Sequence, residues 1–198
     1  MYNQKILPKR FYERDPEIVA KELLGKKLIR KIGCFILEGV IVETEAYYGL
    51  NDPASRAFLG KKKYNSLMWQ EPGRAFIYNV HKYWMFNVIA HEPTKIGAVL
   101  VRAIEPTVGI DTMKSNRPVK NLVNLTNGPG KLTLALKIDK SINGLPVTSK
   151  ESYIIIAEGS ITPKKIRSSG RIGVKKDLER DLRFYIGDNK FISRKQKK

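Results

Sequence analysis

The chain has 198 residues, of which 37 are lysine or arginine and 19 are aspartate or glutamate, so its formal net charge is +18. Such an excess of positive charge points to a polyanionic partner. With 42% hydrophobic residues the chain can fill a sizeable core, which excludes disorder over its full length. A single cysteine, Cys34, excludes a disulfide framework, and two histidines are too few for the usual zinc or iron–sulfur ligand sets.

We expect a soluble, intracellular protein, because the N-terminus lacks the apolar stretch of a signal peptide and no segment approaches the roughly 20 apolar residues of a membrane span. The sequence has no internal repeat, no long linker and no abrupt change in composition, so residues 1–198 are expected to form one domain. Residues from about 193 to 198 are predicted to form a disordered basic tail.

The first predicted element is a helix that begins after Asp15. Asp15 can cap it, Pro16 suits its first position, and Gly25 can end it. Branched and aromatic residues then predict strands, over residues 27–32, 35–44, 76–80, 84–90, 98–104, 153–157 and 182–186. Further helices are predicted over residues 109–113 and 131–137, and basic surface loops over residues 61–63 and 164–170. Many strands joined by short turns favour an α+β fold with a mainly antiparallel sheet.

Two carboxylates, Glu43 and Glu45, stand at the end of an apolar strand. Residues two apart in a strand share one face. If that face is buried, the two carboxylates cannot both be ionised without a cation, a water or backbone donors beside them. The alternative interpretation is that both face solvent at the strand end.

An arginine, Arg102, interrupts the apolar run over residues 99–104. A buried guanidinium is seldom unpaired. Its partner could be Glu105 or Glu43, which would give a structural ion pair, or Glu45, which would give a carboxylate–guanidinium pair able to hold a water molecule.

Aromatic residues surround these charged positions in the sequence. In a basic protein, exposed aromatic rings can hold an unstacked nucleic-acid base. We expect about half of the following six to be core residues instead: Tyr47, Tyr48, Phe76, Tyr78, Tyr83 and Trp84.

Taken together, a series of short motifs resembles the alkyladenine, or 3-methyladenine, DNA glycosylases of the mammalian alkylpurine-glycosylase type. The resemblance extends from about Phe11 to Phe191, and its specificity comes from the order and separation of the motifs. They span residues 20–26, 42–47, 52–55, 76–78, 101–106, 128–132, 171–174 and 182–186, together with Met68 and the pair at 72–73.

The resemblance implies a single α+β domain built on a curved, mainly antiparallel sheet, with flanking helices and no metal or organic cofactor. Its partner would be double-stranded DNA that contains damaged purines, of the 3-methyladenine, 7-methylguanine, hypoxanthine or ethenoadenine type. Such an enzyme flips the damaged nucleotide out of the duplex and hydrolyses its N-glycosidic bond, which initiates base excision repair. We expect it to act as a monomer, in the cytoplasm or nucleoid of a prokaryote or in the nucleus of a eukaryote.

By matching position, the resemblance implies that Glu45 is the general base for the attacking water, and that Arg102 and the backbone carbonyl of Ile172 help to hold that water. The chemistry suits these residue types. Cleavage builds positive charge on the sugar, which a fixed carboxylate stabilises while it accepts a proton from water.

The resemblance also implies a base pocket. Tyr47 and Tyr78 would stack against the flipped base, Leu100 would line the pocket, and Asn87 would crowd the exocyclic amine of normal guanine. Arg56 stands where the family usually has a histidine. An arginine can stack, but its fixed charge disfavours a cationic base nearby.

The segment that fills the gap left in the duplex also departs from the family pattern. A Tyr-Gly-Met motif is replaced by residues 81–84, so His81 is the first choice as the wedge by position, with Tyr83 as the rival. Asp181, where a proline is common, is interpreted as a loop change.

Other interpretations stay open. A lysine such as Lys131 could attack the sugar as a Schiff base, which would make the protein a lyase-active glycosylase. Many small basic domains bind nucleic acid without catalysis. A metal-dependent nuclease that uses Glu43 and Glu45 is a further alternative.

Overall fold

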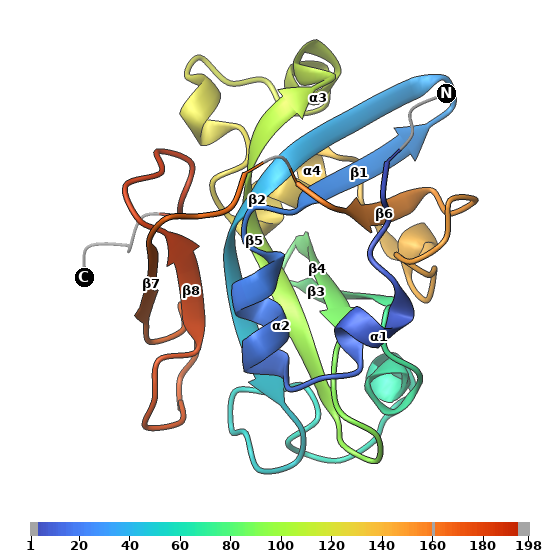
Figure 1. The fold of residues 1–198 in the computed structure, drawn as a ribbon, viewed down its shortest axis with the longest axis vertical. Coiled ribbons are helices and arrows are strands. Elements are labelled where there is room, and N and C mark those ends of the chain that lie inside the picture. The colour runs from blue at the N-terminus through green and yellow to red at the C-terminus, as the bar shows by residue number, and fades with distance from the viewer. Residues whose placement is uncertain (1–3, 160, 194–198) are drawn as a thin grey trace.

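The computed structural model of the protein describes residues 4–159 and 161–193. In this part of the chain eight strands form one curved sheet in which every pairing is antiparallel (Figure 1). The strands are β1 (Lys27–Ile32), β2 (Phe35–Tyr48), β3 (Ala75–Val80), β4 (Tyr83–Ile89), β5 (Gly97–Val108), β6 (Ile154–Ala157), β7 (Ile166–Ser169) and β8 (Arg183–Ile186). The predicted α+β fold is therefore confirmed.

The helices described in the structure are short. The α-helices are α1 (Lys9–Tyr12), α2 (Pro16–Leu23), α3 (Ile110–Asn116) and α4 (Pro129–Ala135), and 3-10 segments lie at Lys63–Trp69, Leu122–Asn124 and Lys140–Ile142. As the sequence predicts, Asp15 caps α2: its carboxylate accepts the Glu17 amide hydrogen at 2.7 Å. The buried face of α2 packs on β2, where the Thr44 hydroxyl donates to the Ala20 carbonyl at 2.8 Å.

The long strand β2 organises the sheet, whose strand order is β3-β4-β5-β2-β1-β6. The first half of β2 pairs with β1, and residues Glu43 to Glu45 pair with β8, while β5 follows the other edge of β2 along nearly its whole length. In turn, β7 pairs with β8. The two carboxylates of β2 therefore have a strand on each side and lie inside the sheet.

A β-bulge occurs where β2 meets β5. Glu43 and the next residue, Thr44, are paired with Ala103 and Val101, so Arg102 is the extra residue of β5 at this point. Bulges change the direction of a side chain and are common beside active sites. Here the bulge places a guanidinium next to the two carboxylates of β2.

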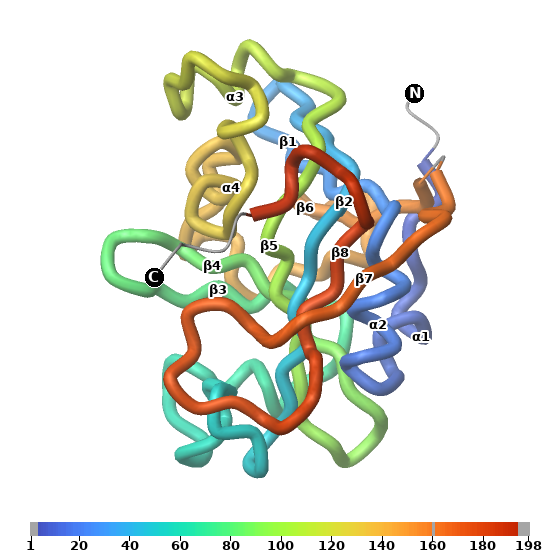
Figure 2. The backbone as a smooth tube through the Cα atoms, turned by 90° about the vertical axis from the view of Figure 1, so that its left-hand side faces the viewer, coloured from blue at the N-terminus to red at the C-terminus, as the bar shows by residue number. Residues whose placement is uncertain are grey.

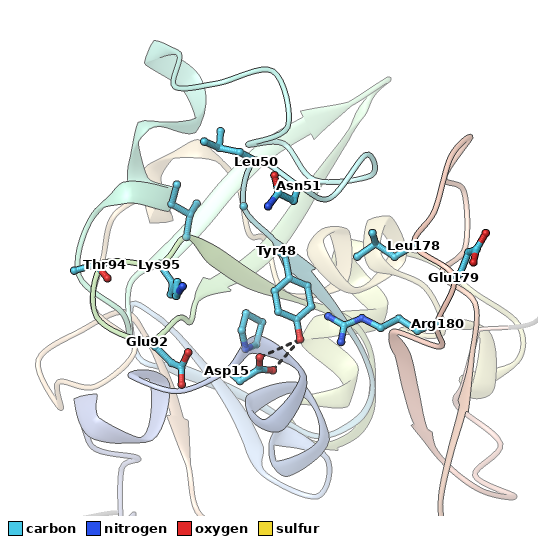
Figure 3. Close-up of a pocket in the computed structure, with 13 residues that line it drawn as sticks. Asp15, Tyr48, Leu50, Asn51, Glu92, Thr94, Lys95, Leu178, Glu179 and Arg180 are labelled. Atoms are coloured by element: carbon cyan, nitrogen blue, oxygen red, sulfur yellow. Dashed lines mark hydrogen bonds between the residues drawn. The ribbon is translucent and has the colours of Figure 1, made fainter.

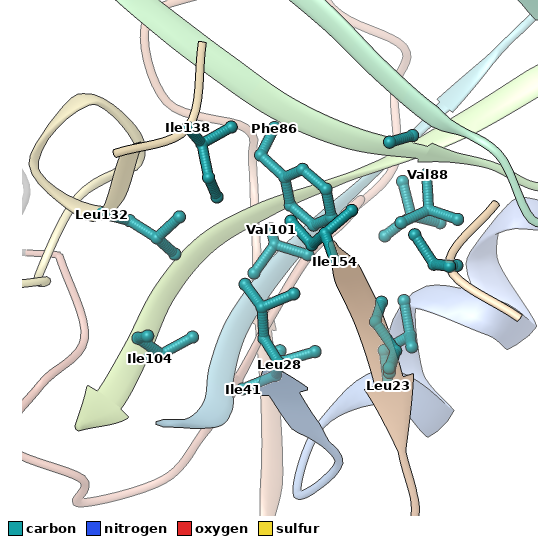
Figure 4. Packing of buried hydrophobic residues seen from close by; sticks show 14 of the residues in the cluster. Leu23, Leu28, Ile41, Phe86, Val88, Val101, Ile104, Leu132, Ile138 and Ile154 are labelled. Atoms are coloured by element: carbon teal, nitrogen blue, oxygen red, sulfur yellow. The ribbon is translucent and has the colours of Figure 1, made fainter. Parts of the chain in front are cut away.

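The main hydrophobic core lies on the face of the sheet that α2 and α4 cover. Figure 4 shows its tightly packed members, which come from five strands and a helix and are fully buried: Leu28, Ile41, Phe86, Val101, Leu132 and Ile154. Burying one such side chain contributes about 1.5–3 kcal/mol. Along β4 the core residues Phe86 and Val88 alternate with Met85 and Asn87, which face the other side of the sheet.

Several predicted boundaries differ from the structure. Strand β2 continues to Tyr48 and β5 to Val108, because each pairs with the other beyond the end of its apolar run. Residues 164–170 were expected to be a loop, yet β7 forms there through pairing with β8. Ser193, placed in the predicted tail, is buried; residues 194–198 of that tail lie outside the described part of the chain.

Candidate active site

Two glutamates and an arginine form the centre of the site. Glu43 and Glu45 are fully buried, which makes the solvent-facing interpretation wrong. Arg102 pairs with both, through Nε to Glu43 Oε1 at 2.9 Å and Nη1 to Glu45 Oε1 at 3.1 Å. The third candidate partner, Glu105, instead accepts a hydrogen bond from Asn189 at 2.8 Å.

Glu43 is held as an ion-pair anchor. Arg183 Nε donates to its Oε1 at 2.7 Å, and the amide and hydroxyl of Ser193 donate to its two oxygens at 2.5 and 2.6 Å. Burial raises the pKa of Glu43, but Arg102, Arg183 and Ser193 together outweigh burial and lower it. Neither Arg183 nor Ser193 is among the predicted site residues; the signals for Arg183 were a charged residue at the start of an apolar strand and its place in the motif at residues 182–186.

Glu45 has a different environment. Its carboxylate accepts hydrogen bonds from the Ile172 amide and the Tyr47 hydroxyl, both at 2.8 Å, in addition to the contact with Arg102. Burial raises the pKa of Glu45, and Arg102, the Ile172 amide and the Tyr47 hydroxyl offset this only in part. The Ile172 group that touches Glu45 is the N–H, whereas the role predicted for Ile172 uses its carbonyl.

A cavity of about 940 Å³ is lined by Tyr47, Arg102 and Ile172, the three residues that contact Glu45, whereas Glu45 itself lies behind this lining. Six of the residues predicted for the site line it: Tyr47, Arg56, Tyr78, Leu100, Arg102 and Ile172. Asn87 is buried outside the lining, and its side-chain amide donates to the carbonyls of Phe76 and Met85 within its own hairpin. Met85, two positions earlier on the same face of β4, is the residue that lines the cavity.

Both tyrosines of the cavity carry a guanidinium on the ring. The Arg56 guanidinium carbon lies 4.6 Å from the centre of the Tyr78 ring, and that of Arg171 lies 4.5 Å from the centre of the Tyr47 ring. Burial raises the pKa of Tyr47 well above its ordinary value, and the negative charge of Glu45 adds to this. Tyr47 therefore stays protonated and donates to Glu45.

Arg171 is a functional residue that the sequence analysis missed. It forms a two-bond ion pair with Asp52, with both distances 2.7 Å, a second pair with Asp177 at 2.5 Å, and a hydrogen bond to the Ala46 carbonyl at 3.0 Å. These bonds fix the loop that delivers the next residue, Ile172, to Glu45. The available signal in the sequence was that Asp52 and Arg171 each belong to a motif of the resemblance, at residues 52–55 and 171–174.

The hairpin of β3 and β4 carries the two wedge candidates. Figure 2 shows this hairpin extending away from the rest of the sheet. His81 is exposed in the two-residue turn at its tip, with φ of 53°. Tyr83 is 37% exposed and packs against the backbone of α4, where a Cβ atom on Gly130 would lie 2.8 Å from the tyrosine ring. Neither residue lines the cavity.

A second cavity, of about 700 Å³, lies near the end of β2. Tyr48 points into it, on the opposite side of the strand from Tyr47. Figure 3 shows the Tyr48 ring between Asp15, whose carboxylate accepts its hydroxyl at 2.9 Å, and Arg180, which lies 4.5 Å from its centre. These contacts tie the segment before β8 to the start of α2.

Residues 4–159 and 161–193 contain no group of three histidine, cysteine or acidic side chains arranged to hold a metal ion. No helix in the same part of the chain has the length and apolar character to cross a membrane.

Known proteins of similar sequence identify the family of the chain. Residues 10–190 match the sequence model of the family described as Methylpurine-DNA glycosylase (MPG). A protein of Aeropyrum pernix named "Putative 3-methyladenine DNA glycosylase" is 38% identical over 192 residues, which cover 96% of this chain and 94% of the relative. Proteins of the same name from Carboxydothermus hydrogenoformans and Clostridium perfringens are 40% and 43% identical, over 96% and 93% of this chain and 100% and 97% of the relatives.

These matches define the class of the protein as a DNA glycosylase, a hydrolase that acts on DNA. Within that class, the chain belongs to the methylpurine-DNA glycosylase family. The resemblance found in the sequence motifs is thereby confirmed.

Proposed function

We propose that the protein is a monofunctional glycosylase that removes damaged purines from double-stranded DNA, with Glu45 activating the attacking water. The observation that carries this proposal is a fully buried carboxylate, 3.1 Å from a guanidinium, whose three contact residues all line a cavity that also holds a second tyrosine. The protein would act as a monomer, in the nucleoid or cytoplasm of a prokaryote or in the nucleus of a eukaryote. Its reaction would initiate base excision repair.

The proposed reaction is a hydrolysis at C1′ of the flipped nucleotide. The bond between C1′ and the purine nitrogen breaks with its electron pair on the purine, and the water oxygen bonds to C1′. One water proton passes to Glu45, and the other stays on the new sugar hydroxyl. A purine alkylated at N3 or N7 leaves as a neutral molecule, whereas an uncharged purine must also gain a proton from solvent.

The surroundings of Glu45 support this role. A carboxylate has about four lone-pair positions, and three protein donors leave capacity for a water. Arg102 favours the ionised form of the Glu45 carboxylate against the cost of its burial, and the ionised carboxylate stabilises the positive charge that develops on the sugar next to it. Leu100, with the Tyr47 and Tyr78 rings, provides an apolar wall for the base.

The decisive experiment measures base release from a duplex with a single hypoxanthine, ethenoadenine or alkylpurine. Replacing Glu45 with glutamine keeps its shape and removes its charge, so the single-turnover rate should fall by about 10²- to 10⁴-fold. Glu92→Gln, at an exposed position outside the cavity, is the matched control. Release by Glu45→Gln at the wild-type rate would remove Glu45 from this role.

One observation favours a second candidate, the lyase mechanism. Lys131 lines the cavity and donates to Asn127 Oδ1 at 2.7 Å. Burial lowers its pKa, and Arg117 lowers it further, which increases the fraction of neutral, nucleophilic amine. Borohydride distinguishes the two mechanisms: a covalent protein–DNA adduct formed on lesion duplex and lost in Lys131→Gln would establish the lyase, and full base release without an adduct would establish the water mechanism.

A further inference from the structure

We propose that Arg56 makes this site selective for uncharged damaged purines over cationic N-alkylated purines. This inference rests on the proposed function and narrows its substrate class. The charges that support it belong to the buried cluster next to the cavity, to the guanidiniums on the two tyrosines and to the lysines of the wall.

The buried charges next to the cavity sum to zero. Glu43, Glu45, Arg102 and Arg183 form a cluster of which only Arg102 lines the cavity; Arg102 pairs with both carboxylates, and Arg183 Nε lies 2.7 Å from Glu43. Two negative charges are therefore balanced by two positive charges within hydrogen-bond distance. A cationic base above this cluster meets little net attraction.

The guanidinium on the Tyr47 ring, that of Arg171, also has little effect on the charge of the cavity. Arg171 covers one face of the ring but does not line the cavity, so a bound base would meet the opposite face. The charge of Arg171 is balanced by Asp52 and Asp177. Its effect on a base across the ring is correspondingly small.

Tyr78 differs from Tyr47, because no negative charge balances the guanidinium that lies on its ring among the described residues. Arg56 lines the cavity, lies 4.6 Å from the ring centre, and forms no ion pair with any residue that the structure describes. The Asn65 side chain donates to the Arg56 carbonyl at 2.7 Å, which fixes the backbone beneath it. A ring that already holds one cation on its electron-rich face is a poorer partner for a second cation.

The rest of the wall adds positive charge only. Lys131, Lys175 and Lys176 line the cavity, and no aspartate or glutamate does so among the described residues. Lys175 and Lys176 are exposed, so DNA phosphates can neutralise them, and Lys131 donates to Asn127 at 2.7 Å. Arg56 stacks on a tyrosine instead, so its charge acts on the base itself.

The test uses two bases of the same shape that differ by one charge. One duplex carries 7-methylguanine and the other its uncharged analogue 7-methyl-7-deazaguanine, both on 2′-fluoro sugars that resist cleavage. Binding is measured at mildly acidic pH, where 7-methylguanine remains a cation. Wild-type protein should bind the uncharged base about three- to tenfold more tightly.

Variants assign the effect to Arg56. Arg56→Gln should bring the two affinities to within about twofold of each other, whereas Arg56→Lys, which keeps the charge, should retain most of the preference. Arg10→Gln, an equal charge change at an exposed position outside the cavity, should leave the ratio unchanged. Equal or tighter wild-type binding of the cation, or an unchanged ratio in Arg56→Gln, would overturn the proposal.

A parallel arm separates this inference from the proposed function. Wild-type protein is incubated with a duplex that contains hypoxanthine on an ordinary sugar. If wild-type protein releases neither hypoxanthine nor the ethenoadenine and alkylpurine tested under the proposed function, that function is overturned. Release of hypoxanthine together with equal binding of the two 7-methyl bases would overturn only the role of Arg56.

Discussion

Glu43 and Glu45 are two residues apart in β2, share Arg102, and have pKa values displaced in opposite directions. Glu43 has two guanidiniums and two Ser193 donors, which overcome the cost of burial. Glu45 has one guanidinium and two uncharged donors, which do not. The number of charged partners therefore separates an anchoring carboxylate, fixed in its ionised form, from a carboxylate that can exchange a proton.

At this residue scale, the raised pKa of Glu45 predicts the pH dependence of the reaction. A protonated Glu45 cannot accept a proton from water, so the single-turnover rate should fall as the pH falls through a midpoint above the ordinary glutamate value. Tyr47→Phe keeps the ring but removes a hydrogen bond that lowers this pKa, so its midpoint should move to higher pH. An identical midpoint in wild type and Tyr47→Phe would contradict the assignment of the acidic limb to Glu45.

The anchoring role of Glu43 predicts a large loss of stability on its replacement. Glu43→Gln removes the carboxylate that pairs with both Arg102 and Arg183, so the two buried guanidiniums are no longer balanced. The free energy of unfolding, measured by urea titration, should fall by about 3–5 kcal/mol. Because the folded pKa of Glu43 is lowered, its contribution is present above the ordinary carboxyl pKa and is lost as the pH falls through the folded value. Glu22→Gln, which breaks the exposed pair with Arg14, should cost only about 0–1 kcal/mol.

The sequence allowed part of this site to be predicted. Equal strand parity placed Glu43 and Glu45 on one face, and an arginine in an apolar run implied a buried carboxylate partner. Spacing could not decide among the three candidate partners of Arg102, since that depends on the register of β2 against β5 and on the bulge. Ser193 is 150 residues from Glu43 in the chain, so no local pattern could reveal their contact.

At the scale of elements, we expect the β3–β4 hairpin to carry the wedge that fills the gap in the duplex, and His81 to be that residue. It stands exposed at the tip, whereas the Tyr83 ring is packed on α4. His81→Gly removes the side chain and tolerates the positive φ of 53°. The single-turnover rate on duplex DNA should fall by about tenfold, with little change on a single strand, where no gap must be filled.

Two further variants check this assignment. Lys82→Ala, at the other position of the turn, removes a phosphate-attracting charge and a contact with the Tyr83 ring at 5.6 Å from its centre, and should weaken binding of damaged and undamaged duplexes equally if Tyr83 is not the wedge. If Tyr83→Ala shows the loss confined to duplex DNA and His81→Gly does not, the wedge is Tyr83.

Elements were predictable from sequence where their signals are local. Helix α2 has its cap, its proline and its apolar stripe within ten residues, and β1 follows from its own branched residues. Strand β7 has an exposed, basic sequence and exists through pairing with β8, which lies at a distance in the chain. The ends of β2 and β5 are likewise set by each other and not by their own composition.

At the scale of the whole molecule, the net charge of +18 predicts strongly salt-dependent binding of DNA, both damaged and undamaged. Each lysine that contacts a phosphate adds about 0.9 to the slope of log affinity against log salt. Lys175 and Lys176 line the cavity on the loop after Ile172 and are exposed, so they are placed to contact the backbone beside a flipped nucleotide.

Replacing Lys175 and Lys176 together with glutamine should reduce that slope by about 1 to 2, and should weaken binding to damaged and undamaged duplexes by the same factor. Lys114→Gln with Lys150→Gln makes the same change in net charge at exposed positions outside the cavity, and should leave the slope nearly unchanged. Equal slopes in the two double variants would mean that overall charge, and not its placement beside the cavity, governs binding. A change in lesion preference in the Lys175 and Lys176 variant would instead show that these lysines act on the base, as proposed for Arg56.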